Sequence, residues 1–208
     1  TSRAIDEIAG ASLYFKCENL QKVGAFKARG ATNAVLALDD EAAGMGVATH
    51  SSGNHAAALA FAAAQRGVSA HVVMPSTAPP VKKAAVAGYG AEITECEPTL
   101  EARETTLEGV VARTGATFIH AYDNPMVIAG QGTAARELVA EVEELDVVVA
   151  PVGGGGLLAG TSIATHAADR AIEVWAAEPA GAADAAASFA AGRIIPSREP
   201  RTLCDGLL

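Results

Sequence analysis

The chain has 208 residues and a formal net charge of −9, and 50% of its residues are hydrophobic. This acidity argues against a nucleic-acid-binding protein, which normally presents a basic surface, and the sequence has no run of about 18 apolar residues that would predict a membrane span. The cysteines Cys17, Cys96 and Cys204 are isolated, so neither a disulfide framework nor a zinc site is indicated, and the cytoplasm is the expected compartment.

Short β-branched segments alternate with longer, alanine-rich amphipathic segments along the chain. The predicted strands are Leu13–Cys17, Val47–His50, His71–Met74, Glu92–Glu95, Thr117–His120, Val147–Pro151 and Glu173–Glu178. The predicted helices are Arg3–Ala9, Arg29–Leu38, His55–Gln65, Pro80–Tyr89, Leu100–Arg113, Gly132–Glu143, Leu157–Ala168 and Ala182–Ala190. This alternation is typical of an α/β fold with mostly parallel open sheets flanked by helices. Since Val147–Pro151 is apolar on both faces, we expect it at the centre of its sheet.

The first candidate motif places a lysine just before the predicted helix that begins at Arg29. It reads Gly24-Ala25-Phe26-Lys27-Ala28-Arg29-Gly30-Ala31. The positive end of a helix dipole favours the neutral form of a nearby amine, which a lysine needs in order to bond a carbonyl carbon. The small neighbours of Lys27 leave room for a flat ring. Taken alone, the stretch also fits a surface lysine beside a turn.

The second motif, His50-Ser51-Ser52-Gly53-Asn54-His55, lies between a predicted strand and a predicted helix. Its hydroxyl groups and the free backbone N–H groups of a helix start can hold a carboxylate. An ordinary helix cap by serine or asparagine is the alternative interpretation.

The third motif is Gly153-Gly154-Gly155-Gly156-Leu157-Leu158-Ala159-Gly160, after the most apolar strand. Consecutive glycines let the backbone surround a phosphate group at the start of the following helix. The same segment also fits the dinucleotide pattern G-x-G-x-x-A, with Glu178 roughly 20 residues further on, as in NAD-binding proteins. The other two motifs argue against NAD, because such an enzyme has no use for Lys27.

In this order, Gly24–Ala31, Ser51–His55 and Gly153–Leu157 resemble the motifs of the serine racemase and serine/threonine dehydratase family of fold-type II pyridoxal-phosphate (PLP) enzymes. Phe15–Asn19 and Ala121–Asp123 extend the resemblance over essentially the whole chain. It implies a two-lobe α/β fold like that of the tryptophan synthase β subunit, with PLP as the cofactor.

The resemblance implies a role for each cofactor-binding residue. Lys27 is expected to bind the cofactor covalently and then to move the Cα proton of the substrate. Phe26 would lie along the cofactor ring, and Asn54 would bond the 3′-oxygen of the cofactor. The phosphate would be held by backbone N–H groups of Gly153, Gly154, Gly155, Gly156 and Leu157.

The resemblance also implies how a small amino-acid substrate is bound. Its carboxylate would be held by Ser51, Ser52, Asn54 and His55. Ser52 would be the second catalytic residue, on the face of the substrate opposite Lys27.

The family's metal site corresponds to Glu178, the backbone carbonyl of Ala182, and Asp184. Oxygen ligands of this kind suit Mg²⁺ or Ca²⁺. The alternative is that the two carboxylates belong to a solvated helix start. The resemblance further implies a homodimer for the full-length protein.

By analogy with the family, residues 47–122 form the smaller, mobile substrate lobe, and residues 1–46 and 123–208 form the larger cofactor-binding lobe. Members of the family extend further at both ends, so the resemblance implies a sequence truncated at both ends, with an incomplete larger lobe. Closure of the smaller lobe on the substrate would exclude water.

The activity expected from the resemblance is that of a PLP-dependent ammonia-lyase. It would dehydrate L-threonine, L-serine or a similar β-hydroxy amino acid to a 2-oxo acid and ammonia. Three alternatives remain open on the same residues. They are a serine or hydroxyaspartate racemase, a catalytically incomplete PLP-binding fragment, and a synthase that replaces a β-substituent.

Overall fold

The computed structural model describes residues 1–168, 171–197 and 199–207 as an α/β protein. Its strands are β1 Val47–His50, β2 Ala70–Pro75, β3 Glu92–Cys96, β4 Thr117–Phe118, β5 Val147–Pro151 and β6 Glu173–Ala177. Its helices are α1 Arg3–Ala9, α2 Lys27–Leu36, α3 Asp40–Gly44, α4 Asn54–Arg66, α5 Pro80–Gly88, α6 Leu100–Thr114, α7 Pro125–Glu141, α8 Gly156–His166 and α9 Asp184–Ala191. Short 3₁₀ turns cover Glu18–Leu20, Lys22–Gly24, Ala180–Ala182 and Asp205–Leu207.

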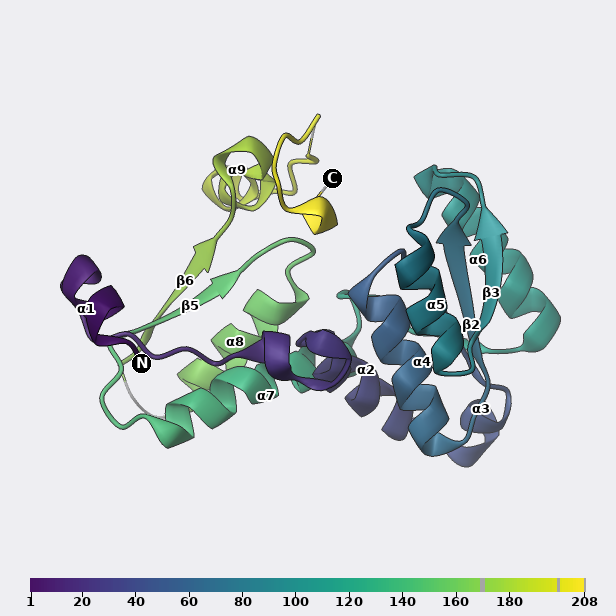
Figure 1. Ribbon diagram of the computed structural model, residues 1–208, viewed down its shortest axis with the longest axis horizontal. Coiled ribbons are helices and arrows are strands. Elements are labelled where there is room, and N and C mark those ends of the chain that lie inside the picture. Colours follow the sequence, from purple (N-terminus) through teal and green to yellow (C-terminus); the bar gives the residue numbers. More distant parts are fainter. Residues whose placement is uncertain (169–170, 198, 208) are drawn as a thin grey trace.

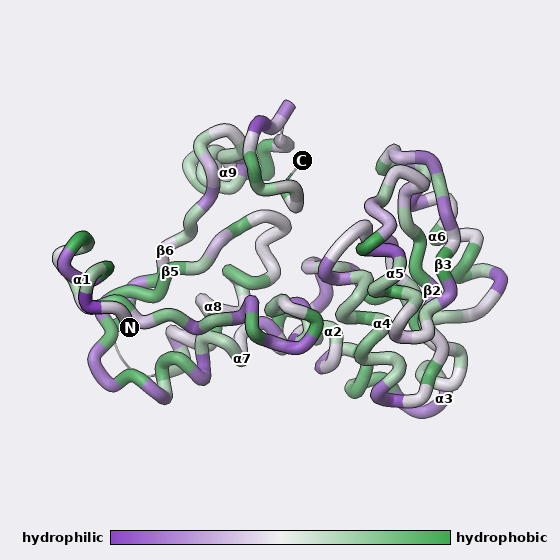
Figure 2. Tube along the Cα trace, viewed as in Figure 1, coloured by the Kyte–Doolittle hydropathy of each residue, from purple (hydrophilic) through white to green (hydrophobic). Residues whose placement is uncertain are grey.

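The first sheet has the strand order β3-β2-β1-β4, and all of its paired strands are parallel. Its two faces bury alternate residues of β2, as the period of a strand requires. Val72 and Met74 pack with residues of α4 and α5, whereas Val73 packs with Leu107 and Val110 of α6. The tube in Figure 2 is correspondingly green along β2. The many alanines of α4 let this helix approach the sheet closely.

The second sheet pairs β5 with β6, again in parallel. Val148 is buried with Val139 of α7 and Ile172, which precedes β6. Val149 and Trp175, which pair in register, are 60% and 56% exposed. The prediction that β5 is central in its sheet is therefore not met in the described part of the chain, where β6 is its single partner.

Helices α2 and α7 lie where the two groups of elements meet. Figure 1 shows β2, β3, α4, α5 and α6 on one side of the molecule and β5, β6, α8 and α9 on the other, with α2 between them. The apolar face of α2 joins the core of the first sheet, since Ala31, Ala34 and Val35 pack with Leu59 of α4 and Val127 of α7. Helix α7 in turn packs along α8. The chain segments before and after the first sheet therefore share one core with it.

The structure confirms the predicted α/β class with parallel sheets and flanking helices, and it corrects several elements. The predicted strand Leu13–Cys17 is not formed, because no described strand lies alongside it to supply a hydrogen-bond ladder. Helix α7 begins at Pro125 rather than Gly132, and Asn124 caps it by accepting hydrogen bonds from two backbone N–H groups. The glycines inside α7 lower its helix propensity and concealed its first two turns. Helix α3 was not predicted.

The proposed division into lobes at residues 46/47 and 122/123 stays a prediction. The first sheet falls within 47–122 and the second within 123–208. Within the described residues, the structure contains no helix that is both long and apolar enough to cross a membrane.

Candidate active site

Lys27 is the first residue of α2, so it lies inside the helix rather than before it as predicted. Its Nζ atom donates a hydrogen bond of 2.7 Å to the carbonyl oxygen of Ala121 and lies 5.2 Å from the centre of the Phe26 ring. Burial lowers the pKa of the Lys27 amine from 10.5 to about 8, because desolvation disfavours the charged form. The neutral fraction of this amine near physiological pH is a minority, but it is far larger than that of an ordinary lysine, and the neutral form is the nucleophile.

The segment His120 to Tyr122 connects Lys27 with the glycine loop. Ala121 holds the lysine through its carbonyl oxygen, and the next residue, Tyr122, packs on the loop. A side chain at Gly154 would overlap the Tyr122 ring, and a Cβ atom on Gly156 would lie 2.8 Å from the Tyr122 carbonyl oxygen. At Gly154 and Gly156, glycine is thus required because Tyr122 packs too closely for a side chain.

The glycine loop turns directly into α8. Gly155 is the N-cap and has a φ of +86°, a left-handed conformation that favours glycine. The helical hydrogen-bond pattern starts at Ala159, whose N–H donates to the Gly155 carbonyl oxygen at 2.9 Å. The backbone N–H groups of Gly156, Leu157 and Leu158 therefore have no acceptor within the helix, and together with the helix dipole they suit an anion.

The predicted carboxylate loop follows β1 and leads into α4. The Ser51 Oγ atom accepts a hydrogen bond of 3.3 Å from the Gly53 N–H, Ser52 is half-buried, and Asn54 is exposed as the first residue of α4. The side chain of His55 is 2% exposed and its Nε2 atom lies 3.0 Å from the Ile119 carbonyl oxygen. His55 therefore faces the core rather than the surface of the loop.

The environment of His55 keeps its ring neutral. Burial lowers the pKa of the imidazole to about 4, and the positive charge of Lys27 contributes to this shift in the same direction. His55 contacts Ile119 and Lys27 contacts Ala121, so both residues lie against the same short segment of the chain. Neutral His55 would donate from Nε2 to Ile119.

Arg103 is a further candidate residue, which sequence reasoning missed. It lies in the first turn of α6, and its positive charge helps to lower the pKa of His50, the residue just before Ser51. The Arg103 Nε atom is buried and has no hydrogen-bond partner among the described residues. No local sequence signal marks this arginine, because its position relative to His50 depends on α6 packing against β1.

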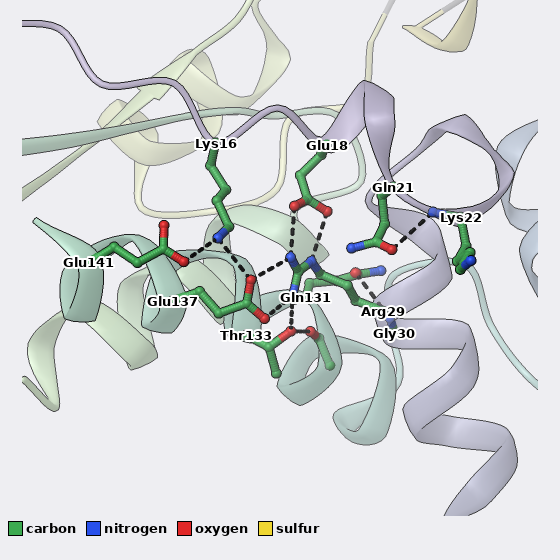
Figure 3. A network of polar contacts seen from close by, with 11 residues as sticks. Lys16, Glu18, Gln21, Lys22, Arg29, Gly30, Gln131, Thr133, Glu137 and Glu141 are labelled. Carbon is green, nitrogen blue, oxygen red and sulfur yellow. Dashed lines mark hydrogen bonds and ion pairs between the residues drawn. The ribbon is translucent and has the colours of Figure 1, made fainter. Parts of the chain in front are cut away.

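The helix that carries Lys27 is held by a network of ion pairs around Arg29 (Figure 3). The Arg29 guanidinium bonds both carboxylate oxygens of Glu18 and both of Glu137, at 2.7–2.8 Å, and the Thr133 hydroxyl at 2.9 Å. Lys16 adds contacts of 3.0 Å to Glu137 and Glu141. Hydrogen bonding raises the pKa of Arg29 and lowers that of Glu137 to about 2. Sequence reasoning missed this network, in which Lys16 and Glu141 bond across 125 positions of the chain.

The predicted metal ligands lie near one another, but one of them has another role. Both carboxylate oxygens of Glu178 cap α9, accepting hydrogen bonds of 3.2 Å from the Ala185 N–H and 2.6 Å from the Ala186 N–H. Within the described residues, no group of three histidine, cysteine, aspartate or glutamate side chains could hold a metal ion. The predicted site is of a different kind, with two carboxylates and one backbone carbonyl, and it stays a prediction.

The whole chain, residues 1–208, matches the protein family described as pyridoxal-phosphate dependent enzyme. A β-hydroxyaspartate dehydratase of Paracoccus denitrificans (strain Pd 1222) is 56% identical over 208 residues, which are 100% of this chain and 66% of that protein. The crystal structure of a serine racemase from Dictyostelium discoideum has a TM-score of 0.94 at 51% identity, covering 99% of this chain and 66% of that one.

An L-threo-3-hydroxyaspartate ammonia-lyase of Saccharomyces cerevisiae is 46% identical over 206 residues, which are 99% of this chain and 63% of that protein. The chain thus spans a little under two thirds of the length of the relatives to which it is similar.

Proposed function

Because the chain belongs to the pyridoxal-phosphate-dependent enzymes, we propose that the protein is an ammonia-lyase that dehydrates a β-hydroxy amino acid. The proposed substrates are L-serine, L-threonine and 3-hydroxyaspartate, and the proposed products are a 2-oxo acid and ammonia. The observation that carries the proposal is the half-buried Lys27 with its pKa near 8, joined through Ala121 and Tyr122 to the glycine loop.

The residues present fit PLP. Lys27 offers an amine whose lowered pKa makes its neutral form more available than that of an ordinary lysine, and the N-terminus of α8 offers unpaired N–H groups beside a loop where glycine is required. We propose that Lys27 holds the cofactor covalently, that Gly153 to Leu157 bind its phosphate, and that Phe26 and Asn54 contact its ring. When bound there, PLP supplies an electron sink that weakens the Cα–H bond of an amino acid.

The chain's own residues would then act as follows. Neutral Lys27 accepts the Cα proton at Nζ, and burial of this amine keeps its proton affinity low enough for the proton to be returned. Loss of this proton and of the β-hydroxyl group removes one water from the amino acid. The unsaturated amine that remains hydrolyses to a 2-oxo acid and ammonia.

The substrate carboxylate is proposed to lie against the Ser51–Asn54 loop. The hydroxyl groups of Ser51 and Ser52 and the N–H groups at the start of α4 can donate to it. His55 would contribute its backbone N–H rather than its side chain, since the imidazole is buried and bonded to Ile119.

Arg103 favours an acidic substrate among the three proposed. Arg103 is partly buried, has an unpaired Nε atom, and its charge acts on His50, the residue before the carboxylate loop. A carboxylate on Cβ of the substrate would supply the missing acceptor, and charge-assisted pairs with arginine are strong. The relative from Paracoccus denitrificans, described as a β-hydroxyaspartate dehydratase, supports this choice.

Racemisation is the second candidate activity. Ser52 is half-buried in the loop and carries a hydroxyl that can exchange a proton, and the structurally similar Dictyostelium protein is described as a serine racemase. If Ser52 delivers a proton to the face opposite Lys27, the product is the other enantiomer of the substrate.

We further propose a homodimer located in the cytoplasm, and both properties remain predictions from the resemblance. The Mg²⁺ or Ca²⁺ site at Glu178, Ala182 and Asp184 also remains a prediction. It would require Glu178 to share or release its two contacts with α9. No step of the proposed reaction depends on that metal.

The test is product analysis of the purified protein loaded with PLP. We expect 2-oxo acid and ammonia in equal amounts from L-serine, L-threonine or 3-hydroxyaspartate, and no product from Lys27→Ala. Steady formation of a D-amino acid without 2-oxo acid would show a racemase instead of a lyase. In that case, Ser52→Ala should abolish the formation of the D-amino acid. Cofactor binding at Lys27 without any turnover would favour the catalytically incomplete alternative.

A further inference from the structure

We propose that Gly130, Gln131 and Gly132 of α7 are positioning residues that set the separation between Lys27 and the glycine loop. The inference rests on the proposed cofactor site, because PLP must reach the lysine with its carbonyl carbon and the loop with its phosphate. Helix α7 packs against both α2, which begins with Lys27, and α8, which begins within the loop.

On the α2 side, the backbones of the two helices touch at a pair of glycines. A Cβ atom on Gly130 would lie 2.6 Å from the Gly30 Cα atom and 2.7 Å from the Arg29 carbonyl oxygen. A Cβ atom on Gly30 would lie 2.7 Å from the Val127 carbonyl oxygen. Because these neighbours are backbone atoms, α2 and α7 cannot stay at this distance if either glycine gains a side chain.

Gln131 adds a directional contact to the same junction. Its side chain is 1% exposed, and its Oε1 atom accepts a hydrogen bond of 3.2 Å from the Gly30 N–H, in the first turn of α2 (Figure 3). Gly30 is three residues after Lys27, so this bond holds the turn from which the lysine projects. The five hydrogen bonds of Arg29 to Glu18, Thr133 and Glu137 hold that turn from outside.

On the α8 side, the contact is again between glycines. A Cβ atom on Gly132 would lie 2.7 Å from the Gly160 carbonyl oxygen, and one on Gly160 would meet the Ile128 carbonyl oxygen and the Gly132 nitrogen. Gly160 is in the second turn of α8, one turn beyond the loop glycines. At these glycines, helix α7 therefore lies against α2 and α8 with backbone on backbone.

The test compares PLP with pyridoxal, which has the same carbonyl group but no phosphate. The affinity for pyridoxal depends on Lys27 but not on the phosphate-binding loop. The affinity for PLP depends on both, and therefore on the distance between them. The variants are Gly130→Ala and Gly132→Ala, and the matched control is Gly109→Ala in α6, where a Cβ atom meets nothing within 4 Å. The affinity of each protein for both ligands is measured from the absorbance of the attached cofactor, with Lys27→Ala as the blank.

We expect the preference for PLP over pyridoxal to fall by about tenfold to a hundredfold in Gly130→Ala and Gly132→Ala, since a displacement of about 1 Å can have effects of this size. Affinity for pyridoxal should change little, and Gly109→Ala should match the wild type in both. If the glycines act only on stability, the affinities for both ligands should fall together and their ratio should stay unchanged. That result would overturn the proposal.

Gln131→Met provides a variant that inserts nothing between the helices. It keeps the shape of the side chain and removes the acceptor for the Gly30 N–H, so a smaller fall in the same ratio is expected. An unchanged ratio in this variant, folded as judged by its melting curve, would overturn the role of Gln131. If the wild type attaches neither ligand at Lys27, the proposed cofactor site itself is wrong. If the wild type attaches both ligands and no variant alters their affinity ratio, only the positioning role is wrong.

Discussion

The Nζ atom of Lys27 lies 2.7 Å from the carbonyl oxygen of Ala121, a residue 94 positions further along the chain. This contact joins the start of α2 to the segment that packs on the glycine loop through Tyr122. The atoms packed around the amine bury it, and this burial lowers the pKa of Lys27.

The pH dependence of cofactor attachment follows from that pKa. The folded value, about 8, lies below the ordinary value of 10.5, so the amine becomes neutral as pH rises through about 8. We expect the rate of PLP attachment at Lys27 to increase with a midpoint near pH 8, as followed by absorbance in stopped-flow experiments. Lys27→Ala should lack this phase, and a midpoint close to 10.5 would contradict the burial of the amine.

Arg103 should decide between acidic and neutral substrates. In Arg103→Ala, we expect kcat/KM for 3-hydroxyaspartate to fall by about a hundredfold, because a partly desolvated charge pair is lost, while kcat/KM for L-serine changes by less than about threefold. Arg113→Ala, in the exposed last turn of the same helix, is the matched control. Equal losses for both substrates would show that Arg103 has no part in selecting the β-substituent.

Arg29 should be important for stability. Arg29→Ala removes the cation that bonds both Glu18 and Glu137, and we expect a loss of about 3 kcal/mol in the free energy of unfolding. Lys16→Ala removes a more exposed partner of Glu137 and should cost about 1 kcal/mol or less. Urea unfolding of the two variants measures the difference, and similar small losses in both would mean that the network contributes little.

His55 should make the protein sensitive to mild acid. Its pKa is lowered from 6.5 to about 4 in the folded state, so between these values the unfolded chain binds a proton that the folded chain does not. The free energy of unfolding should therefore fall as pH decreases from about 6.5 to about 4, by about 3 kcal/mol from this group.

Unfolding by urea at pH 7, 5.5 and 4.5 measures this dependence. We expect His55→Gln, which keeps a donor for Ile119, to flatten the profile, whereas His166→Gln at an exposed position of α8 should not. A profile that is unchanged in His55→Gln would assign the acid sensitivity to other groups.

The sequence by itself determined the α/β class, most of the helices and the bounds of the described strands to within one or two residues, because hydrophobic period and turn residues are local properties. It also determined the lysine, serine and glycine motifs, since each is a continuous segment whose chemistry depends on residue type and on the adjoining helix start. The interpretation as a PLP enzyme was confirmed by the family to which the chain belongs.

The tertiary structure decided the rest, because these features depend on contacts between distant segments. The carbonyl of Ala121 at Lys27, the unpaired Nε atom of Arg103 and the glutamates around Arg29 all join positions far apart in the chain. The burial of His55 follows from α4 packing on the sheet, and Leu13–Cys17 is not a strand because no strand of the described residues pairs with it. A local pattern can indicate which groups are present, but only packing fixes which of them meet and how much water remains around them.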